Sequence, residues 1–456
     1  MTSSPGFTVH VDHNPYLPVG GRDVSAVVTV TAGAADDASP VRVGADGNAE
    51  IIIVDCSGSM SGAKILAARG ATSAAVDVIR DGTRFAIIAG ARRAWPVYPK
   101  DGSMAVADEL TRAAARRAAA GLRTKWSPPS AGTAIGQWLR LACQIFQSCP
   151  AALSHAILLT DGQNVSEMPK QLAAAIKLCK GVFRCDCRGV GTDWSVDELR
   201  KISTALLGTV DIVPDPAGLA ADFEEMMRGA MGKQLPDVML RVWTPQQAST
   251  TYVKQVAPAI DDLTGRRVRS GPLAGGPHVG DYPTGAWAPG ESRDYHVGVQ
   301  VNAGGVGQEM LAARVSLVSS APSAQQVLGQ GLIRATWTED EALSTRINRG
   351  VAHYTGQAEL AAAIQEGLEA SKQGDEQTAT ARLGRAVALA HQAGNEDTAR
   401  LLAKVVDVVD EAAGTVRLKK KVSAEDEMAL DTRSVKTVRV GMDAREAPRS
   451  VRNDGF

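Results

Sequence analysis

The sequence predicts an α/β protein, in which a doubly wound and mostly parallel sheet is inserted in an antiparallel β-sandwich and followed by a small helical bundle. Three observations lead to this prediction. Residues 50–232 alternate between apolar runs and helical patterns, shorter segments with a period of two flank them on both sides, and residues 338–414 have apolar positions at helical spacing. A chain of 456 residues is also too long for one core, which favours several domains.

The central domain is predicted at residues 48–235. Strands are expected at 50–54, 84–90, 94–98, 154–160, 183–190 and 209–213, and helices at about 62–80, 104–120, 134–147, 167–180, 195–206 and 216–231. This alternation predicts a sheet that is covered on both faces. Residues 94–98 follow the preceding strand too closely for a helical crossover and contain Pro96, so they are expected to form an antiparallel edge strand.

Two stretches on either side of this domain predict a single β-sandwich. Residues 1–47 contain two alternating segments, which are too few to form a stable sheet alone. Residues 236–337 supply further short alternating segments among turns rich in glycine and proline. If both stretches build one sandwich, the central domain is an insertion whose ends lie close together.

The C-terminal part is predicted to form a helical bundle at residues 338–415 and a flexible tail at residues 416–456. Helices are expected to start at Glu339 and to cover 357–372, 375–392 and 395–412, with Gly374 and Gly394 as stop signals. The tail combines low hydrophobicity with blocks of opposite charge, which is typical of segments without a fixed fold.

Charge and cysteine content give no support to a nucleic-acid-binding, membrane-bound or disulfide-rich secreted protein. The chain has 49 basic and 50 acidic residues, so the total charge gives no indication of a nucleic-acid partner or an anionic membrane. Residues 1–6 lack the features of a signal peptide, and no run approaches the roughly 18 apolar residues of a membrane span. Six cysteines in so long a chain predict reduced thiols. We therefore expect a cytoplasmic protein.

Oxygen-bearing side chains follow three predicted strands or loops. The apolar run of residues 50–54 ends in Asp55-Cys56-Ser57-Gly58-Ser59, Thr133 precedes a predicted helix, and Asp161 follows the strand at 154–160. Because ligands bind at the carboxyl ends of strands in open α/β sheets, Asp55, Ser57, Ser59, Thr133 and Asp161 are expected to converge there. Two carboxylates and three hydroxyls suit a hard cation such as Mg²⁺ and leave it open to a further oxygen.

In this order, Asp55-x-Ser57-x-Ser59, Thr133 and Asp161 resemble the metal-ion-dependent adhesion site (MIDAS) of von Willebrand factor A (VWA) domains. The resemblance covers residues 48–232 and is closest to the bacterial cytosolic type. It implies that these five residues bind Mg²⁺ or Mn²⁺, and that an acidic residue of a protein partner completes the coordination. The chain is then a protein-binding scaffold and not an enzyme.

Alternatives to this function remain open. Related bacterial proteins act beside AAA+ ATPases of the metal-chelatase or MoxR-like type, or in kinase and phosphatase clusters. A metal-dependent hydrolase is a second alternative because a bound metal can activate water, although the motif contains no His or Glu as a base. A third is a VWA domain that has lost its metal. Asp and Ser can also simply form a turn and cap a helix.

Other candidate sites are weaker. Cys179, Cys185 and Cys187 lack a fourth ligand at zinc-site spacing, so we expect them to be buried as small apolar residues. His155 has no partner in the sequence and is expected to pack in the core. Residues 189–191 lack the third glycine of a dinucleotide-binding loop.

Two threonines of the predicted tail resemble a different recognition motif. Thr432 and Thr437 each have a valine three residues later, Val435 and Val440, as do ligands of forkhead-associated (FHA) domains. The hypothesis is that a Ser/Thr kinase modifies one threonine and that an FHA-domain partner then binds it. Phosphorylation would add about two negative charges and strong acceptors for arginine. A solvated tail without this role is the alternative.

Overall fold

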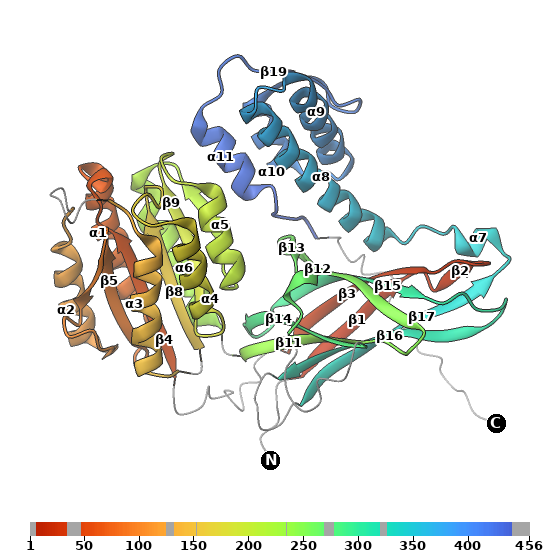
Figure 1. Ribbon diagram of the computed structural model, residues 1–456, viewed down its shortest axis with the longest axis horizontal. Coiled ribbons are helices and arrows are strands. Elements are labelled where there is room, and N and C mark those ends of the chain that lie inside the picture. Colours follow the sequence, from red (N-terminus) through yellow and green to blue (C-terminus); the bar gives the residue numbers. More distant parts are fainter. Residues whose placement is uncertain are drawn as a thin grey trace, which may run out of the picture.

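The protein is represented by a computed structural model that describes residues 6–33, 47–124, 132–151, 153–233, 235–268, 278–319 and 326–439. It contains an α/β domain, a β-sandwich and a C-terminal helical part (Figure 1). The predicted fold class is confirmed, because a doubly wound sheet is inserted in the sandwich and helices follow. Residues 440–456 of the predicted tail, including Val440, lie outside the described residues.

The α/β domain is built on a seven-stranded sheet with the main strand order β10-β9-β8-β4-β5-β6. Its strands are β4 (Asn48–Asp55), β5 (Arg84–Gly90), β6 (Ala94–Tyr98), β7 (Ala105–Val106), β8 (Leu153–Thr160), β9 (Arg184–Val190) and β10 (Val210–Val213). The strands β10, β9, β8, β4 and β5 are parallel, whereas β6 is the antiparallel edge strand that the sequence predicts. Because β4 lies in the interior of the sheet, its carboxyl end is central on the edge where ligands bind.

Helices cover both faces of this sheet, which explains the continuous apolar run in β4. Ile51 and Ile53 pack with one set of helices, and Ile52 and Val54 pack with the other. The first set is α3 (Ile135–Ser148), α4 (Pro169–Cys179) and α5 (Val196–Ala205), and the second is α1 (Ala63–Asp77), α2 (Glu109–Ala120) and α6 (Leu219–Gly232). Residues 49–55 of β4 are therefore all buried.

The sandwich combines strands from both sides of the α/β domain. One sheet has the order β1-β3-β15-β12-β13 and the other has the order β14-β11-β16-β17-β2. The strands are β1 (Phe7–His13), β2 (Tyr16–Pro18), β3 (Asp23–Ala32), β11 (Leu235–Trp243), β12 (Ala248–Ala257), β13 (Asp261–Asp262), β14 (Val279–Trp287), β15 (Ser292–Val301), β16 (Glu309–Ser319) and β17 (Val327–Thr338). β3 pairs antiparallel with β15, and β2 pairs with β17. The α/β domain is therefore inserted between β3 and β11, which belong to opposite sheets.

The C-terminal part contains helices and one small hairpin. Its elements are α7 (Glu341–Ser344), α8 (Arg349–Lys372), α9 (Glu376–Gln392), α10 (Glu396–Val405), β18 (Val406–Asp410), β19 (Thr415–Leu418) and α11 (Ala424–Arg433). No helix in the described part of the chain is long and apolar enough to cross a membrane.

The helix predicted at 395–412 is too long, because α10 ends at Val405 and the chain enters the hairpin. Valines at alternate positions, Val406 and Val408, favour this strand. The hairpin turn packs on α9 through Gly414 and Gly384. A Cβ on either glycine would lie 2.3 Å from the carbonyl oxygen of the other, so this contact requires both glycines.

The prediction of a flexible tail is wrong for residues 416–439. β19 and α11 are ordered, and α11 lies against the α/β domain (Figure 1). Asp431 Oδ1 accepts a hydrogen bond from Arg200 Nη2 of α5 at 2.6 Å. Asp211 of β10 accepts from Arg433 Nε at 3.1 Å and from Lys436 Nζ at 2.9 Å. Asp431, Arg433 and Lys436 of the predicted tail therefore have partners in another domain.

The residues after α11 contact the sandwich. Thr437 Oγ1 donates to the carbonyl oxygen of Val256 at 2.6 Å, and Arg439 Nη2 pairs with Asp294 Oδ1 at 3.2 Å. Ile260 N donates to Val435 O at 2.8 Å. The C-terminal segment therefore joins the α/β domain, the sandwich and the helical part.

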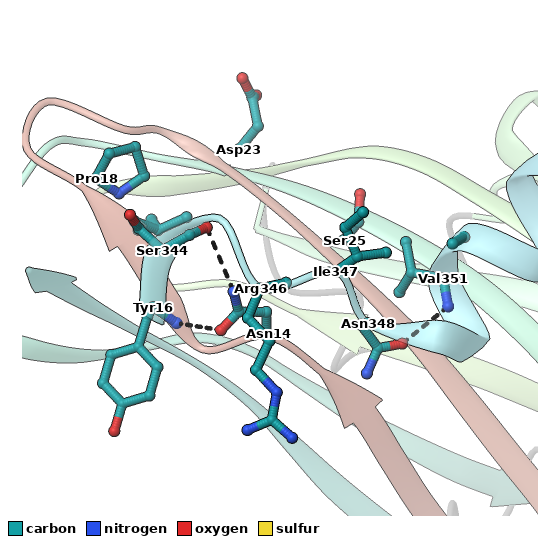
Figure 2. Close-up of a pocket in the computed structure, with 12 residues that line it drawn as sticks. Asn14, Tyr16, Pro18, Asp23, Ser25, Ser344, Arg346, Ile347, Asn348 and Val351 are labelled. Atoms are coloured by element: carbon teal, nitrogen blue, oxygen red, sulfur yellow. Dashed lines mark hydrogen bonds between the residues drawn. The ribbon is translucent and has the colours of Figure 1, made fainter. Parts of the chain in front are cut away.

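The connection from the sandwich to the helices is anchored by Asn14 (Figure 2). Its Nδ2 donates to the carbonyl oxygens of Leu343 at 2.9 Å and Arg346 at 3.0 Å. In Figure 2, dashed lines join its Nδ2 to Ser344 O at 3.4 Å and its Oδ1 to Tyr16 N at 3.1 Å. Asn348 caps α8 by accepting from Val351 N at 2.9 Å. The hollow of about 340 Å³ at this junction is lined by both segments.

His155 is not a simple core residue as the sequence suggested, because it joins two carboxylates of neighbouring strands. Its Nδ1 lies 2.7 Å from Glu50 Oε2, and its Nε2 lies 2.9 Å from Asp186 Oδ2. Burial alone lowers the pKa of His155, but the two carboxylates outweigh burial and raise that pKa to about 9. The folded protein therefore keeps a proton on His155 that the unfolded chain loses near its ordinary pKa of 6.5.

This cluster predicts a loss of stability in alkaline solution. The contribution of His155, up to about 3 kcal/mol, is fully present below pH 6.5 and is lost as the pH rises through about 9. We expect the Tm to fall over this interval. In Glu50→Gln, which removes one of the carboxylates that raise the pKa of His155, we expect the fall to be smaller and to end at lower pH. Thermal melting between pH 6 and pH 10 measures both effects. A wild-type Tm that stays constant between pH 7 and pH 9.5 contradicts the assignment.

Candidate metal centre

Asp55 is the last residue of β4 and is completely buried. Its Oδ1 accepts a hydrogen bond from Ser57 N at 2.7 Å, which folds the loop back on the end of the strand. Its Oδ2 accepts from Thr160 Oγ1 of β8 at 2.6 Å. These two contacts hold the carboxylate in one orientation.

A chain of hydroxyls joins this loop to the second carboxylate. Ser57 Oγ and Ser59 Oγ lie 3.0 Å apart, and Ser59 Oγ donates to Asp161 Oδ1 at 2.7 Å. Ser57 and Asp161 are buried, whereas Ser59 is exposed. The alternate spacing of Asp55, Ser57 and Ser59 therefore directs the three side chains to one place that opens to solvent.

Thr133 reaches the same place from the loop before α3. A Cβ built on Gly162 would lie 3.5 Å from both Thr133 Oγ1 and Ser59 Oγ, so the two hydroxyls border the same glycine. The N-terminus of α3 is capped from outside, because Ile135 N donates to Asn164 Oδ1 at 2.8 Å. Thr133 is therefore not needed as a helix cap. The structure therefore links Asp55, Ser57, Ser59 and Asp161 through hydrogen bonds and places Thr133 beside Ser59 across Gly162.

Lys64, in the first turn of α1, is a member of this site that the sequence analysis missed. Its Nζ donates to Asp161 Oδ2 at 2.6 Å and lies 3.6 Å from Asp193 Oδ2. Burial lowers the pKa of Lys64, but the contact with Asp161 outweighs burial and raises it. The position of Lys64, five residues after Ser59 and directly inside a helix start, is a signal that could have suggested this role.

The negative charges of the buried carboxylates favour a cation next to them. Burial raises the pKa of Asp55 to about 6, although hydrogen bonds from Thr160 and Ser57 lower it, and the charge of Asp161 raises it further. Two carboxylates and three hydroxyls form the oxygen-rich donor set that Mg²⁺ and Mn²⁺ prefer. The residues present therefore fit a hard divalent cation.

The cysteines offer no competing site. All six lie in the described residues and are free thiols, and Cys185 Sγ and Cys187 Sγ lie 4.0 Å apart. Cys179, Cys185 and Cys187 are buried, in agreement with the role expected from the sequence. Within the described ranges, no three or more His, Cys, Asp or Glu residues are arranged to hold a metal ion. The candidate centre differs from such clusters because hydroxyls supply three of its five side chains.

A protein described as von Willebrand factor type A from Catenulispora acidiphila is similar to this chain over almost its whole length. Its solved structure is 51% identical, matches 96% of this chain and 99% of its own, and superposes with a TM-score of 0.88. The chain belongs to the von Willebrand factor type A family. The VWA domain model matches residues 49–212, and a model of the VWA C-terminal domain matches residues 388–434.

Two more distant solved structures have a similar fold. A paralogue of ArnB from Sulfolobus acidocaldarius is 12% identical over 94% of this VWA protein and 98% of its own chain, with a TM-score of 0.56. A human COPII-coat protein is 10% identical over 86% of this chain and 57% of its own, with a TM-score of 0.51. A Synechocystis protein described as uncharacterized is 26% identical over 218 residues, and the chain spans about half the length of that relative.

The two threonines predicted as phosphorylation sites are not on a flexible tail of this VWA protein. Thr432 is 2% exposed, and its hydroxyl donates to Met428 O at 2.8 Å inside α11. Thr437 is half-buried and donates to Val256 O. A kinase needs an exposed, extended segment, so the ordered structure argues against Thr432 as a substrate.

Proposed function

We propose that this VWA protein is a cytoplasmic protein-binding scaffold without catalytic activity. It docks an acidic side chain of a partner through Mg²⁺ or Mn²⁺ held by Asp55, Ser57, Ser59, Thr133 and Asp161. The observation that supports the proposal is the convergence of these side chains at an edge of the sheet where Ser59 is exposed. VWA domains generally mediate protein–protein interactions, and six free cysteines suit a reducing compartment.

The charges of the site favour an acidic partner. The carboxylates of Asp55 and Asp161 balance the two charges of a divalent cation, which supplies an electrophilic position for a further oxygen. Lys64 adds one positive charge beside Asp161. Asp193 lies 3.6 Å from Lys64 Nζ and balances that charge, so the electrophilic position is the cation itself, and a partner carboxylate is the complementary group.

A positively charged groove next to the site extends this complementarity. It has a volume of about 510 Å³, and its lining includes Arg92, Arg93 and Arg140 together with Ala134, the neighbour of Thr133. One carboxylate, Glu167, also lines the groove. The three guanidinium groups outnumber it, so the surface beside the metal site supports binding of an acidic segment.

The test is a comparison of proteins captured from an extract of the native source. We expect a partner to bind the wild type in Mg²⁺ and to be lost both in EDTA and with Asp161→Asn. The Arg92→Glu, Arg93→Glu double variant serves as a matched control, because it should keep the stabilisation by Mg²⁺ but retain less of the same partner. Mass spectrometry then distinguishes an AAA+ ATPase, a Ser/Thr kinase, an FHA-domain protein and other partners. Capture that is equal under all conditions contradicts the proposal.

A further inference from the structure

Lys64 lies with its ammonium group directly against one of the proposed metal ligands. We infer that Lys64 is a built-in competitor of the divalent cation for Asp161, and that it thereby lowers the metal affinity of the site. The inference rests on the proposed metal site, and it assigns a role to a residue outside the five predicted ligands. Asp161 is fully buried, so water cannot stabilise its negative charge, and a positively charged group next to it must do so instead.

Both oxygens of Asp161 are already bonded in the structure. Oδ1 accepts from Ser59 Oγ at 2.7 Å, and Oδ2 accepts from Lys64 Nζ at 2.6 Å. The second contact is a charge-assisted hydrogen bond, which is stronger than the bond from a neutral hydroxyl. A cation that approaches Asp161 must therefore weaken an existing ion pair.

The competition follows from the sum of the charges. Without Lys64, the site would bury the carboxylates of Asp55 and Asp161 among neutral hydroxyls, and both would favour an incoming cation. Lys64 reduces the net charge of this group from minus two to minus one. The ammonium group of Lys64 also repels a divalent ion directly, and salt screens this repulsion little because the site is partly buried.

Asp193 provides a second partner for the displaced ammonium group. Its Oδ2 lies 3.6 Å from Lys64 Nζ, and its side chain is 73% exposed. The lysine end also lies beside Gly191, where an added Cβ would be 3.8 Å from Nζ. Lys64 can therefore leave Asp161 without losing all of its compensating charge, which makes an exchange between metal and lysine physically accessible.

A different role for Lys64 makes the opposite prediction. If the ammonium group only positions Asp161 for the metal, removing Lys64 releases the carboxylate and metal binding becomes weaker. If Lys64 competes, removing it makes metal binding tighter. The sign of the change in affinity thus separates the two roles.

Isothermal titration of full-length protein with MgCl₂ or MnCl₂ alone measures this sign. We expect Lys64→Met to bind the metal about tenfold more tightly than the wild type, because a nearby like charge has been removed. Lys64→Arg keeps the charge and should remain close to the wild type. Lys177→Met removes the same charge from the exposed last turn of α4 and should have little effect.

Thermal melting gives a second measurement. In EDTA, Lys64→Met should melt at a lower temperature than the wild type, and saturating Mg²⁺ should reduce or reverse the difference. A variant that folds only when Mg²⁺ is added also supports the inference. Equal or weaker metal binding by Lys64→Met overturns it while leaving the metal site intact. If neither protein binds Mg²⁺ or Mn²⁺, the proposed function fails together with the inference.

Discussion

Replacing Trp138 with alanine should lower the free energy of unfolding by about 3–5 kcal/mol and should also impair metal binding. Trp138 is fully buried on α3, and its Nε1 donates to Ala91 O at 2.6 Å. Its ring packs so closely on Gly90, at the end of β5, that an added Cβ there would lie 2.3 Å from a ring carbon. Urea denaturation measures the first effect, and titration with Mg²⁺ measures the second.

The loss of metal binding would follow from the position of the helix. Trp138 joins α3 to the end of β5, and Thr133 lies just before the same helix. A cavity below the helix would let Thr133 move relative to Asp55. Trp138→Phe keeps most of the packing and loses the hydrogen bond, so it should cost less stability and retain metal binding. Normal Mg²⁺ affinity in Trp138→Ala would show that α3 does not position the site.

Replacing Thr432 with glutamate should detach α11 from the α/β domain. Thr432 is almost completely buried, and its Oγ1 lies 3.4 Å from Asp211 Oδ1. A carboxylate at this position would be buried beside Asp211 and close to Asp431, so we expect a cost of about 3 kcal/mol or more. Limited digestion with trypsin should then cleave after Arg433 and Lys436 faster than in the wild type.

Thr432→Ser is the control for this experiment, because it keeps the hydroxyl that donates to Met428 O. It should resist trypsin nearly as well as the wild type. If Thr432→Glu resists trypsin as well as the wild type, α11 accepts a negative charge at this position without detaching from the α/β domain. In that case the hypothesis of threonine phosphorylation would regain support.

The residues of the proposed metal site could be identified in the sequence because their signals are local and occur in a fixed order. Each carboxylate directly follows an apolar strand, and parallel strands bring their carboxyl ends to one edge. The interior position of β4 was also implied by its continuous apolar run, since a strand covered on both faces has no polar side. The inserted arrangement followed from β1 and β3, which needed further strands to form a sheet.

The partners of charged residues could not be predicted in the same way. Lys64 and Asp161 are 97 residues apart, and Asp431 and Arg200 are 231 residues apart. A charge run such as that at residues 419–427 has the composition of a solvated tail, but Asp426 pairs with Lys404 of α10 and Lys419 Nζ donates to Ala403 O, contacts that the composition does not reveal. His155 was misjudged for the same reason, because Glu50 and Asp186 lie on neighbouring strands.

The inserted position of the VWA domain also affects how the chain is made. β3 pairs with β15, and about 260 residues separate Ala32 from Ser292. At about 5–20 residues per second, a ribosome needs about 13–52 s to synthesise them. During this time the valine-rich β3 has one unpaired edge, while the VWA domain can already fold. We therefore expect the inserted α/β domain to fold before the sandwich during synthesis, so that the first strands to emerge are among the last to be completed.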